Sequence, residues 1–285
     1  MSNQLKTTLL LTLLSVLLIY IGQILGGHSG MIIAFVFAAI MNVGAYWFSD
    51  KIVLALYRAQ PLEQEHEIYG LVREIAQRAR MPLPRLYRIP SEAPNAFATG
   101  RNPAHGVVVV SDGLLRILST EELKGVLAHE MSHIKNRDTL ISAIAATIAS
   151  CIVMLANMAK WAAIFGGMSG RRDGEDRHGG ALGFLFMAIL APLAASLIQM
   201  AISRSREFQA DANGAQFAGG ASGLISALQK IHAAARQMPL ERATPATAHL
   251  FIINPLTAGS FLQLFSTHPP IEQRIERLKN FRAYV

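Results

Sequence analysis

Long apolar runs alternate with polar segments along this chain. Four runs approach the length of about 20 mostly apolar residues that a bilayer-spanning helix requires: 7–26, 31–48, 140–165 and 181–203. The first two are separated only by the short segment GHSG at 27–30, and the last two by a charged, glycine-rich loop. This pattern predicts four helices in two membrane hairpins. Because a second run follows the first so closely, we expect the first to be a retained anchor and not a cleaved signal peptide.

The polar segments show the shorter periodicities of a compact domain. The predicted elements are a helix over 61–81 with Pro61 near its start, short strands over 85–89 and 106–111, and a helix that opens at Thr120 with acidic residues in its first turn. The predicted organisation is an N-terminal transmembrane hairpin (1–50), a first polar part (51–138), a second membrane hairpin (139–203) and a second polar part (204–285). The fold class expected is a mainly α integral membrane protein, with four apolar helices in two hairpins and an α+β domain that contains a small sheet.

Composition and charge agree with a membrane protein. Hydrophobic residues make up 52% of the chain and charged residues 16%, which is too apolar for an ordinary soluble domain. Segment 51–138 has 12 Lys and Arg and segment 204–285 has 9, against one in the N-terminal tail and three in the 166–180 loop. By the positive-inside rule, both polar segments face the cytoplasm. The net charge of +7 contains no block of basic residues, so nucleic acid is not an expected partner.

One helix carries residues typical of a metal site. His129 and His133 are separated by four residues, so they share one helical face and can bind a single ion, while Glu130 stands beside that ion where it can take a proton from water. The single cysteine, Cys151, excludes a disulfide framework and a four-cysteine zinc site. Two ordinary histidines on a surface helix would show the same spacing, so this interpretation depends on a third ligand.

A later amphipathic segment offers that ligand. Glu207 and Asp211 also share one helical face. Glu207 can be the third protein ligand that a catalytic zinc site needs, and Asp211 can accept the N–H of a ligand histidine and so fix its tautomer. Spacing alone leaves open a solvated acidic pair beside Arg204 and Arg206.

Together these motifs resemble a known family. H-E-x-x-H followed by a distant E-x-x-x-D, with apolar runs on either side, is similar to the membrane-bound zinc endopeptidases that include HtpX and the CAAX prenyl proteases. Three stretches carry the resemblance to the HtpX branch: PNAFATG at 94–100, LAHEMSHIKNRD at 127–138 and THPPIEQRI at 267–275. The resemblance covers essentially the whole chain, including both pairs of apolar runs.

The resemblance implies roles for individual residues. The implied zinc ligands are His129, His133 and Glu207, the general base is Glu130, and Asp211 supports a ligand histidine. It further implies that His268 stabilises the oxyanion, that Arg274 is a basic residue near the site, and that Asn95, Ala96 and Phe97 form a strand that binds the substrate backbone. Asp138 matches an acidic position, with helix termination, hydrogen bonding and catalysis all left open. Arg274 could equally pair with Glu272 or Glu276 at the surface.

The fold that the resemblance implies for segments 51–138 and 204–285 is a zincin-type α+β catalytic domain in two parts. The implied function is a zinc-dependent endopeptidase with one Zn²⁺ per chain. Its expected location is the bacterial cytoplasmic (inner) membrane, as a multi-pass protein with its catalytic domain in the cytoplasm. Expected partners are the lipid bilayer, membrane-protein substrates and unfolded polypeptides, as in membrane quality control. Three alternatives remain: a silent zinc scaffold, for which Glu130 would be superfluous; a transporter subunit, although the apolar runs contain almost no ionisable residues; and a CAAX-type protease, for which four spans are few.

Overall fold

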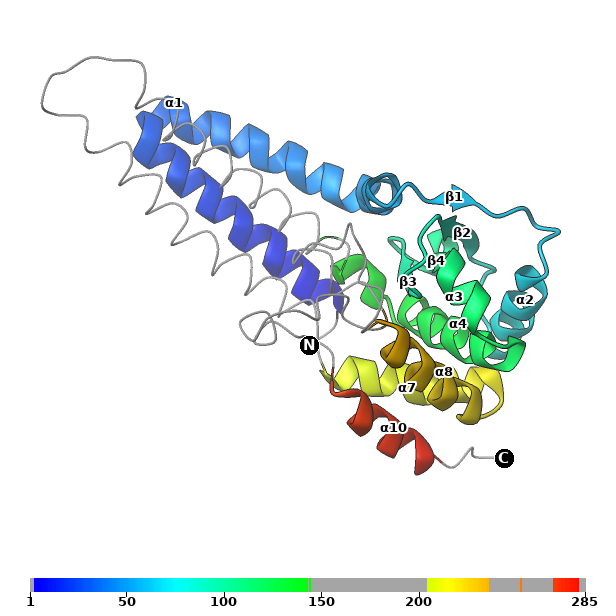
Figure 1. The fold of residues 1–285 in the computed structure, drawn as a ribbon. Helices are drawn as coiled ribbons and strands as arrows, with labels where there is room; N and C mark the ends of the chain where they lie inside the picture. The colour runs from blue at the N-terminus through cyan, green and yellow to red at the C-terminus, as the bar shows by residue number, and fades with distance from the viewer. Residues whose placement is uncertain (1–2, 143, 145–203, 236–251, 253–268, 282–285) are drawn as a thin grey trace, which may run out of the picture.

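The structure of the protein, a computed structural model, describes residues 3–142, 144, 204–235, 252 and 269–281. Figure 1 shows a long helical hairpin beside a domain built from a small sheet and several helices. The hairpin contains the first two apolar runs of the sequence, and the domain carries the polar residues that the sequence singles out.

Helix α1 (Asn3–Leu56) contains the first two apolar runs. The chain reverses direction at Gly27, whose φ of 57° lies in the left-handed region that glycine tolerates. The side-chain amide of Asn42 donates to Oγ of Ser15 at 2.8 Å, although the two residues are 27 positions apart. A straight helix would separate them by about 40 Å. The two arms therefore lie side by side as a hairpin, as the sequence predicts for this part of the chain (Figure 1).

The second arm of α1 has the length and composition of a membrane span. Among the described residues, Gly27–Phe48 is the one helical stretch long and apolar enough to cross a bilayer. Its apolar side chains are exposed: Ile33 is 69% and Ile40 is 65% accessible. Such an extended apolar surface indicates contact with a membrane or another protein. The predicted spans at 140–165 and 181–203 lie almost wholly outside the described residues, so four spans stay a prediction.

The domain contains a four-stranded mixed sheet of order β1-β2-β4-β3. Its strands are β1 (Gln60–Pro61), β2 (Arg85–Ile89), β3 (Ala96–Thr99) and β4 (Val107–Ser111). β2 and β4 pair in parallel at the centre, and β1 and β3 form antiparallel edges. The predicted small sheet is confirmed. The two predicted strands coincide with β2 and, within one residue, with β4.

The predicted helix over 61–81 is wrong at its start. Helix α2 spans only Ile68–Ala79. Pro61 lies in edge strand β1, a position that suits a residue without an amide hydrogen. Leu62 donates its backbone N–H to the carbonyl of Leu86 at 2.9 Å, and its side chain packs against the core from this extended segment. Leu62, whose spacing fits the apolar face of the predicted helix, therefore lies in the extended segment after β1 and not in α2.

The sheet is covered on both faces by different parts of the chain. Residues alternate along a strand between the two faces. One set of side chains packs with α2 and α4 in the main core: Ala96, Ala98, Val108 and Val110. The other set packs against the end of α1: Phe97, Val107 and Val109 meet Val53, Leu54 and Tyr57. The helical hairpin is thus continuous with the hydrophobic core of the domain.

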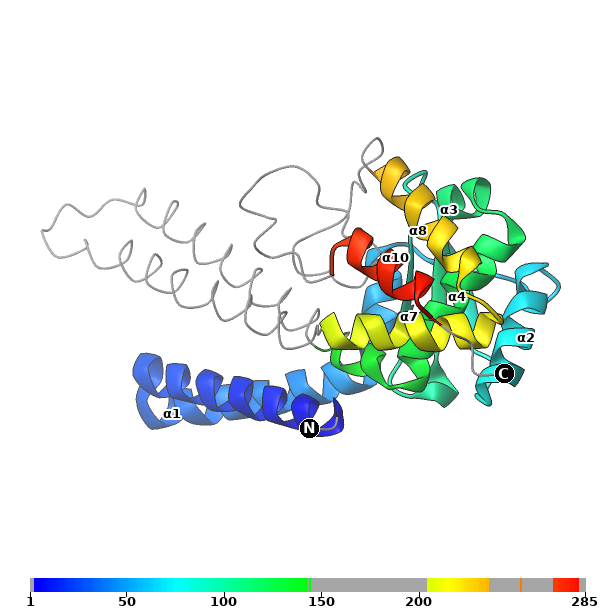
Figure 2. The same ribbon diagram turned by 90° about the horizontal axis from the view of Figure 1, so that it is seen from below.

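Helix α4 (Thr120–Lys135) is the central helix of the domain. It begins with a capping box, in which Ser119 and Glu122 each bind the other's backbone N–H. The other described helices are α3 (Asp112–Ile117), α7 (Arg204–Ala218), α8 (Ser222–Ala235) and α10 (Ile271–Lys279), with a short 3₁₀ turn at Pro103–His105. Figure 2 shows α7 lying beside α4, with α8 and α10 on the same side of the domain.

Glycine permits the close approach of α7 to α4. A Cβ at Gly214 would lie 2.9 Å from the backbone N and Cα of His129. Any larger residue would have to push the two helices apart. The sequence of α7 thus brings its polar face directly against the middle of α4.

Candidate metal centre and active site

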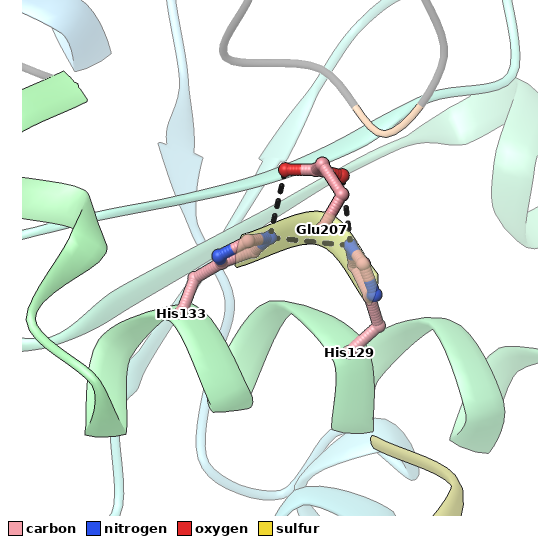
Figure 3. Close-up of side chains that lie close together, drawn as sticks. All are labelled: His129, His133 and Glu207. Carbon is pink, nitrogen blue, oxygen red and sulfur yellow. Dashed lines mark hydrogen bonds and ion pairs between the residues drawn. The ribbon is translucent and has the colours of Figure 1, made fainter. Parts of the chain in front are cut away.

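Helix α4 presents two imidazoles to one point in space. His129 and His133 lie four residues apart, and their Nε2 atoms approach to 3.2 Å. The two rings meet edge to face, with centroids 4.8 Å apart. Figure 3 shows both side chains rising from one face of the helix toward the same side. This is the arrangement that the spacing predicts.

Helix α7 adds a carboxylate to this pair from the opposite side. Glu207 places Oε1 3.5 Å from Nε2 of His133 and Oε2 3.8 Å from Nε2 of His129 (Figure 3). The three residues offer ligand atoms that all lie within 4.8 Å of one another. Residues 74 positions apart in sequence therefore converge because α7 packs against α4 at Gly214.

The three side chains fit a tetrahedral zinc ion. Zn–N and Zn–O bonds of about 2.0–2.1 Å place the ligand atoms of a tetrahedral site about 3.3 Å apart. The observed separations of 3.2, 3.5 and 3.8 Å lie close to this value. Two imidazoles and one carboxylate leave a fourth position for water, as catalytic zinc sites do.

Carboxylates behind the imidazoles hold both rings. Nδ1 of His129 lies 2.9 Å from Oδ1 of Asp211, and Nδ1 of His133 lies 3.0 Å from Oδ2 of Asp138. A hydrogen on each Nδ1, donated to the carboxylate, leaves each Nε2 lone pair available to a metal ion. The role of Asp138, open from sequence, is a hydrogen bond to His133.

A turn after α4 brings Asp138 to this position. Residues five apart on a continuous helix point in directions about 140° apart, so Asp138 would face away from His133. The helix ends at Lys135, and Arg137 takes a left-handed φ of 58° before the chain becomes helical again at Asp138. This reversal folds the carboxylate back onto the imidazole.

Arg274, on α10, is buried behind Asp211. Its guanidinium makes two hydrogen bonds to that carboxylate, Nε to Oδ2 at 2.9 Å and Nη2 to Oδ1 at 2.6 Å. The residue is only 1% exposed, so a surface pair with Glu272 or Glu276 is ruled out. Burial opposes ionisation of Asp211, but Arg274 outweighs it and holds the pKa of this carboxyl far below its usual range.

The other ionisable groups of the site are also perturbed. Glu130 is 3% exposed, and burial raises the pKa of its carboxyl. Burial works against a charged imidazole at His133, but Glu207 and Asp138 outweigh it and raise its pKa to about 9. A proton and a metal cation therefore compete for His133.

The strand expected to bind substrate lies at the edge of the sheet. The structure places Ala96 and Phe97 in edge strand β3, and Asn95 immediately before it. The side chain of Asn95 is buried, and its Oδ1 accepts a hydrogen bond from the backbone N–H of Ala96 at 3.0 Å. His268, expected to stabilise the oxyanion, lies outside the described residues.

Two residues near the site were not predicted. Ile252 donates its backbone N–H to the carbonyl of Ala96 at 3.1 Å, and its own carbonyl accepts from Nη1 of Arg274 at 3.0 Å. Backbone contacts of this kind leave no signal in a sequence. Arg206 places Nη1 3.7 Å from Oδ1 of Asp138. The sequence could have indicated this residue because it directly precedes Glu207.

The sequence also matches a known family over most of its length. Residues 62–282 match the model of peptidase family M48. The chain belongs to peptidase family M48. Membership of M48 makes it a metalloprotease, and the family match includes all three residues that could hold the metal.

Relatives of high similarity agree with this assignment. The chain is 56% identical over 282 residues to a protein named Protease HtpX homolog from Syntrophobacter fumaroxidans, covering 98% of this chain and 100% of the relative. It is 54% identical to one from Desulfatibacillum aliphaticivorans (99% and 91%) and 53% identical to one from Pyrococcus furiosus (96% and 94%). These M48 relatives support a membrane-associated protease.

A solved structure shares the fold. The crystal structure of Ste24p from S. mikatae superposes with a TM-score of 0.51 at 21% sequence identity. The similarity covers 87% of this chain and 57% of that one. At this identity the comparison shows a shared fold.

Proposed function

We propose that the protein is a zinc-dependent endopeptidase with one zinc ion per chain. The observation that carries this proposal is the convergence of His129, His133 and Glu207 at separations close to those of a tetrahedral zinc site. The buried carboxyl of Glu130 lies on the same helix, next to His129. A purely structural zinc site is closed by four protein ligands and needs no such base.

Each residue then has a defined task. A zinc ion held by the three ligands would polarise a water molecule and the carbonyl of the scissile bond. Glu130 takes the proton from the attacking water and delivers it to the departing amine. Asp211 and Asp138 keep the two imidazoles in the tautomer that binds a cation, and Arg274 holds Asp211 ionised.

Substrate contacts and oxyanion stabilisation complete the proposal. An extended polypeptide is proposed to add a strand at the outer edge of β3, where backbone hydrogen bonds recognise chain conformation more than side-chain identity. His268 is proposed to meet the negative charge that develops on the carbonyl oxygen, as the family resemblance implies. Asn95, Ala96 and Phe97 are the residues proposed to bind the substrate backbone, as the family resemblance implies.

We place this activity at the cytoplasmic face of the bacterial inner membrane. The support is the exposed apolar span at Gly27–Phe48 and the excess of Lys and Arg in both polar segments. The proposed substrates are misfolded or damaged membrane proteins and unfolded polypeptides. Proteolysis of such chains would contribute to membrane-protein quality control.

The test combines zinc content with cleavage of casein by purified protein. Wild type is expected to hold one zinc ion and to cleave casein. Glu130→Gln should keep its zinc but lose activity by at least about a hundredfold, since a general base contributes about 10²–10⁴-fold. Glu207→Ala should lose both zinc and activity. Glu272→Gln, an exposed change on α10, serves as the control and should match wild type.

Two outcomes would contradict the proposal. Zinc-loaded Glu130→Gln that cleaves casein at the wild-type rate would exclude Glu130 as the base. Wild type that binds zinc but cleaves neither casein nor a reconstituted membrane protein would support the alternative of a structural zinc scaffold.

A further inference from the structure

Aromatic and basic side chains meet where the apolar span of α1 ends. Trp47 and Phe48, the last two residues of the span, are 49% and 50% exposed. Cζ of Arg101 lies 4.6 Å from the centre of the Trp47 ring. Nζ of Lys51 lies 5.4 Å from the centre of the Phe48 ring. Because a tryptophan at the end of a span typically marks the lipid–water interface, both cations lie at the level of lipid headgroups.

Hydrogen bonds hold Arg101 in its place over Trp47. Nη2 of Arg101 lies 2.8 Å from Nε2 of His105, and since a guanidinium can only donate, this Nε2 is the acceptor. The ring hydrogen of His105 is therefore on Nδ1, which donates to Oδ1 of Asn102 at 2.8 Å. The same Oδ1 accepts the backbone N–H of His105 at 3.1 Å. The guanidinium is thus positioned before any ligand binds.

The loop that carries Arg101 is attached to the helical segment after α4. The carbonyl of Gly100 accepts a hydrogen bond from Oγ1 of Thr139 at 2.8 Å. Thr139 directly follows Asp138, whose carboxylate lies 3.0 Å from Nδ1 of His133. Whatever Arg101 binds at the membrane surface therefore also fixes the position of the candidate metal centre relative to that surface.

The two cations have no carboxylate of their own. Within the part of the chain that the structure describes, neither Arg101 nor Lys51 forms an ion pair. The carboxylate next to Lys51, that of Asp50, lies 3.3 Å from Nη2 of Arg85. Three cations and one carboxylate leave this face with an excess of positive charge. Arg101 uses one N–H on His105, so its other N–H groups remain for an acceptor.

A phosphate diester is the acceptor that fits this position. Its free oxygens match the parallel N–H donors of a guanidinium, which binds phosphate in a bidentate manner. At the end of a membrane span, the phosphates within reach are those of lipid headgroups. A zwitterionic headgroup carries a cation beside its phosphate, whereas an anionic headgroup does not, so the excess positive charge favours the anionic one.

We propose that the face formed by Trp47, Phe48, Lys51 and Arg101 binds the headgroups of anionic phospholipids. The headgroup phosphates pair with Arg101 and Lys51, while the rings of Trp47 and Phe48 contact the acyl chains next to them. This inference goes beyond the endopeptidase activity and shares with it only the placement of α1 in a membrane. Binding holds the domain at a defined height above the bilayer.

The test measures lipid contact at Trp47 by fluorescence. The chain has two tryptophans, so Trp161→Phe leaves Trp47 as the reporter. The full chain is placed in mixed vesicles in which either phosphatidylglycerol or phosphatidylcholine carries brominated acyl chains, which quench a tryptophan that they touch. Quenching, normalised to unbrominated vesicles, gives the ratio of the two binding constants. Phosphatidylglycerol should be favoured about fivefold or more, since a basic residue near an anionic surface contributes about that factor.

Variants in the Trp161→Phe background connect this preference to individual side chains. Arg101→Gln and Lys51→Gln should each lower the ratio by at least about threefold. His105→Ala changes no charge but releases the guanidinium, and it should lower the ratio by about twofold. Arg73→Gln, which removes an exposed arginine on α2, is the matched control and should leave the ratio unchanged.

Three outcomes would overturn the inference. Equal quenching by the two brominated lipids would show that the face does not select anionic headgroups. A loss in Arg73→Gln as large as that in Arg101→Gln would show that only the net charge of the protein matters. Loss of the preference in sodium phosphate, but not in sodium chloride of the same ionic strength, would make the ligand free phosphate and not a lipid.

The lipid measurement is independent of proteolysis. Casein cleavage by the same preparations is recorded separately. A fivefold preference for phosphatidylglycerol in a protein that cleaves nothing would refute the proposed function and leave this inference intact, and active protein without the preference would do the reverse.

Discussion

At the scale of single residues, the site depends on carboxylates that bind no metal themselves. Asp138 and Asp211 each lie within hydrogen-bond distance of the Nδ1 atom of a histidine, at 3.0 and 2.9 Å. An imidazole has two nitrogens, and a partner on one of them decides which is available to a cation. In the proposed metal site, affinity for the cation is therefore expected to depend partly on residues outside the ligand set.

Replacing Asp138 tests this dependence. Asp138→Ala removes the acceptor for Nδ1 of His133, so the ring is free to turn and to change tautomer. The affinity for zinc should fall by about 10–100-fold, as for other carboxylates that support a ligand histidine. Competition with a chromogenic chelator would measure it. Asp112→Asn on α3 changes a carboxylate remote from the site and should leave the affinity unchanged; an Asp138→Ala affinity equal to wild type would refute the role.

At the scale of secondary structure, helix α4 has two roles. Its first turn bonds to α8, and its middle carries the proposed metal ligands. Its first turn is held by Glu122, which accepts from the N–H of Ser119 and also binds Oγ of Ser226 and Nζ of Lys230 on α8. Its middle carries His129 against Gly214 of α7. Small changes in how α7 or α8 packs on α4 should therefore move the proposed metal ligands.

The contacts of Glu122 should make stability depend on pH. Burial opposes its ionisation, but the bonds from Lys230 and Ser226 outweigh this and lower its pKa from 4.5 to about 2. A lowered pKa stabilises the fold above pH 4.5, and this contribution is lost as the pH falls toward 2. Glu122→Gln should lower the free energy of unfolding by about 2–3 kcal/mol at pH 7, with a difference that shrinks between pH 4.5 and 2.

Thermal unfolding of both proteins in the presence of a chelator would measure this effect without a contribution from metal loss. Glu121→Gln, at the exposed neighbouring position, is the control and should follow wild type at every pH. A difference between Glu122→Gln and wild type that persists at pH 2 would show that the carboxylate charge is not its source.

A pair of glycine substitutions tests the contact between α7 and α4. Gly214→Ala inserts a Cβ 2.9 Å from the backbone of His129, so α7 must move away and take Glu207 with it. We expect a loss of about 1–3 kcal/mol in stability together with a loss of zinc. Gly70→Ala, in α2, meets no atom within 4 Å and should stabilise the protein by about 0.5–1 kcal/mol through helix propensity.

Zinc content and melting temperature of the two variants would show whether the contact at Gly214 positions Glu207. Both replace glycine by alanine inside a helix, so helix propensity cancels between them. Equal zinc content in both variants would mean that the close approach of the helices does not position Glu207.

At the scale of the whole molecule, the helical hairpin α1 and the domain share a core. The last turn of α1 and Tyr57 cover one face of the sheet, and α2 and α4 cover the other. Val53 and Tyr57 are 2% and 4% exposed, whereas Leu56 between them is 42% exposed. The hairpin therefore does more than tether the domain, because its end completes the packing of the sheet.

Tyr57→Ala tests this shared core. Loss of a buried aromatic ring should destabilise the domain by about 3 kcal/mol. Its melting temperature in detergent should fall by roughly 5–10 °C. Leu56→Ala removes an exposed side chain at the adjacent position and should change the melting temperature little. Equal effects of the two substitutions would indicate that α1 and the sheet do not form one cooperative unit.

Local sequence patterns predicted much of the fold and of the candidate site. The spacing of His129 and His133 places both on one helical face whatever the rest of the chain does, because helical geometry is local. Continuous valines at 107–110 predicted a short strand, and the apolar runs up to Phe48 predicted the first hairpin. The prediction for 61–81 went wrong because an apolar residue in an edge segment, Leu62, happened to fall at helical spacing.

What the sequence determined by itself is the chemistry: which residues could bind a metal ion, which could act as a base, and which segments are too apolar for water. Tertiary structure alone decided which of these residues contact one another. Asp138 reaches His133 only through the left-handed turn at Arg137. Ile252 reaches Ala96 and Arg274 through backbone atoms that every residue possesses. The contact of β3 with the end of α1 depends on packing between segments about 40 residues apart, and contacts over such distances are set by the shape of the whole core and not by any local pattern.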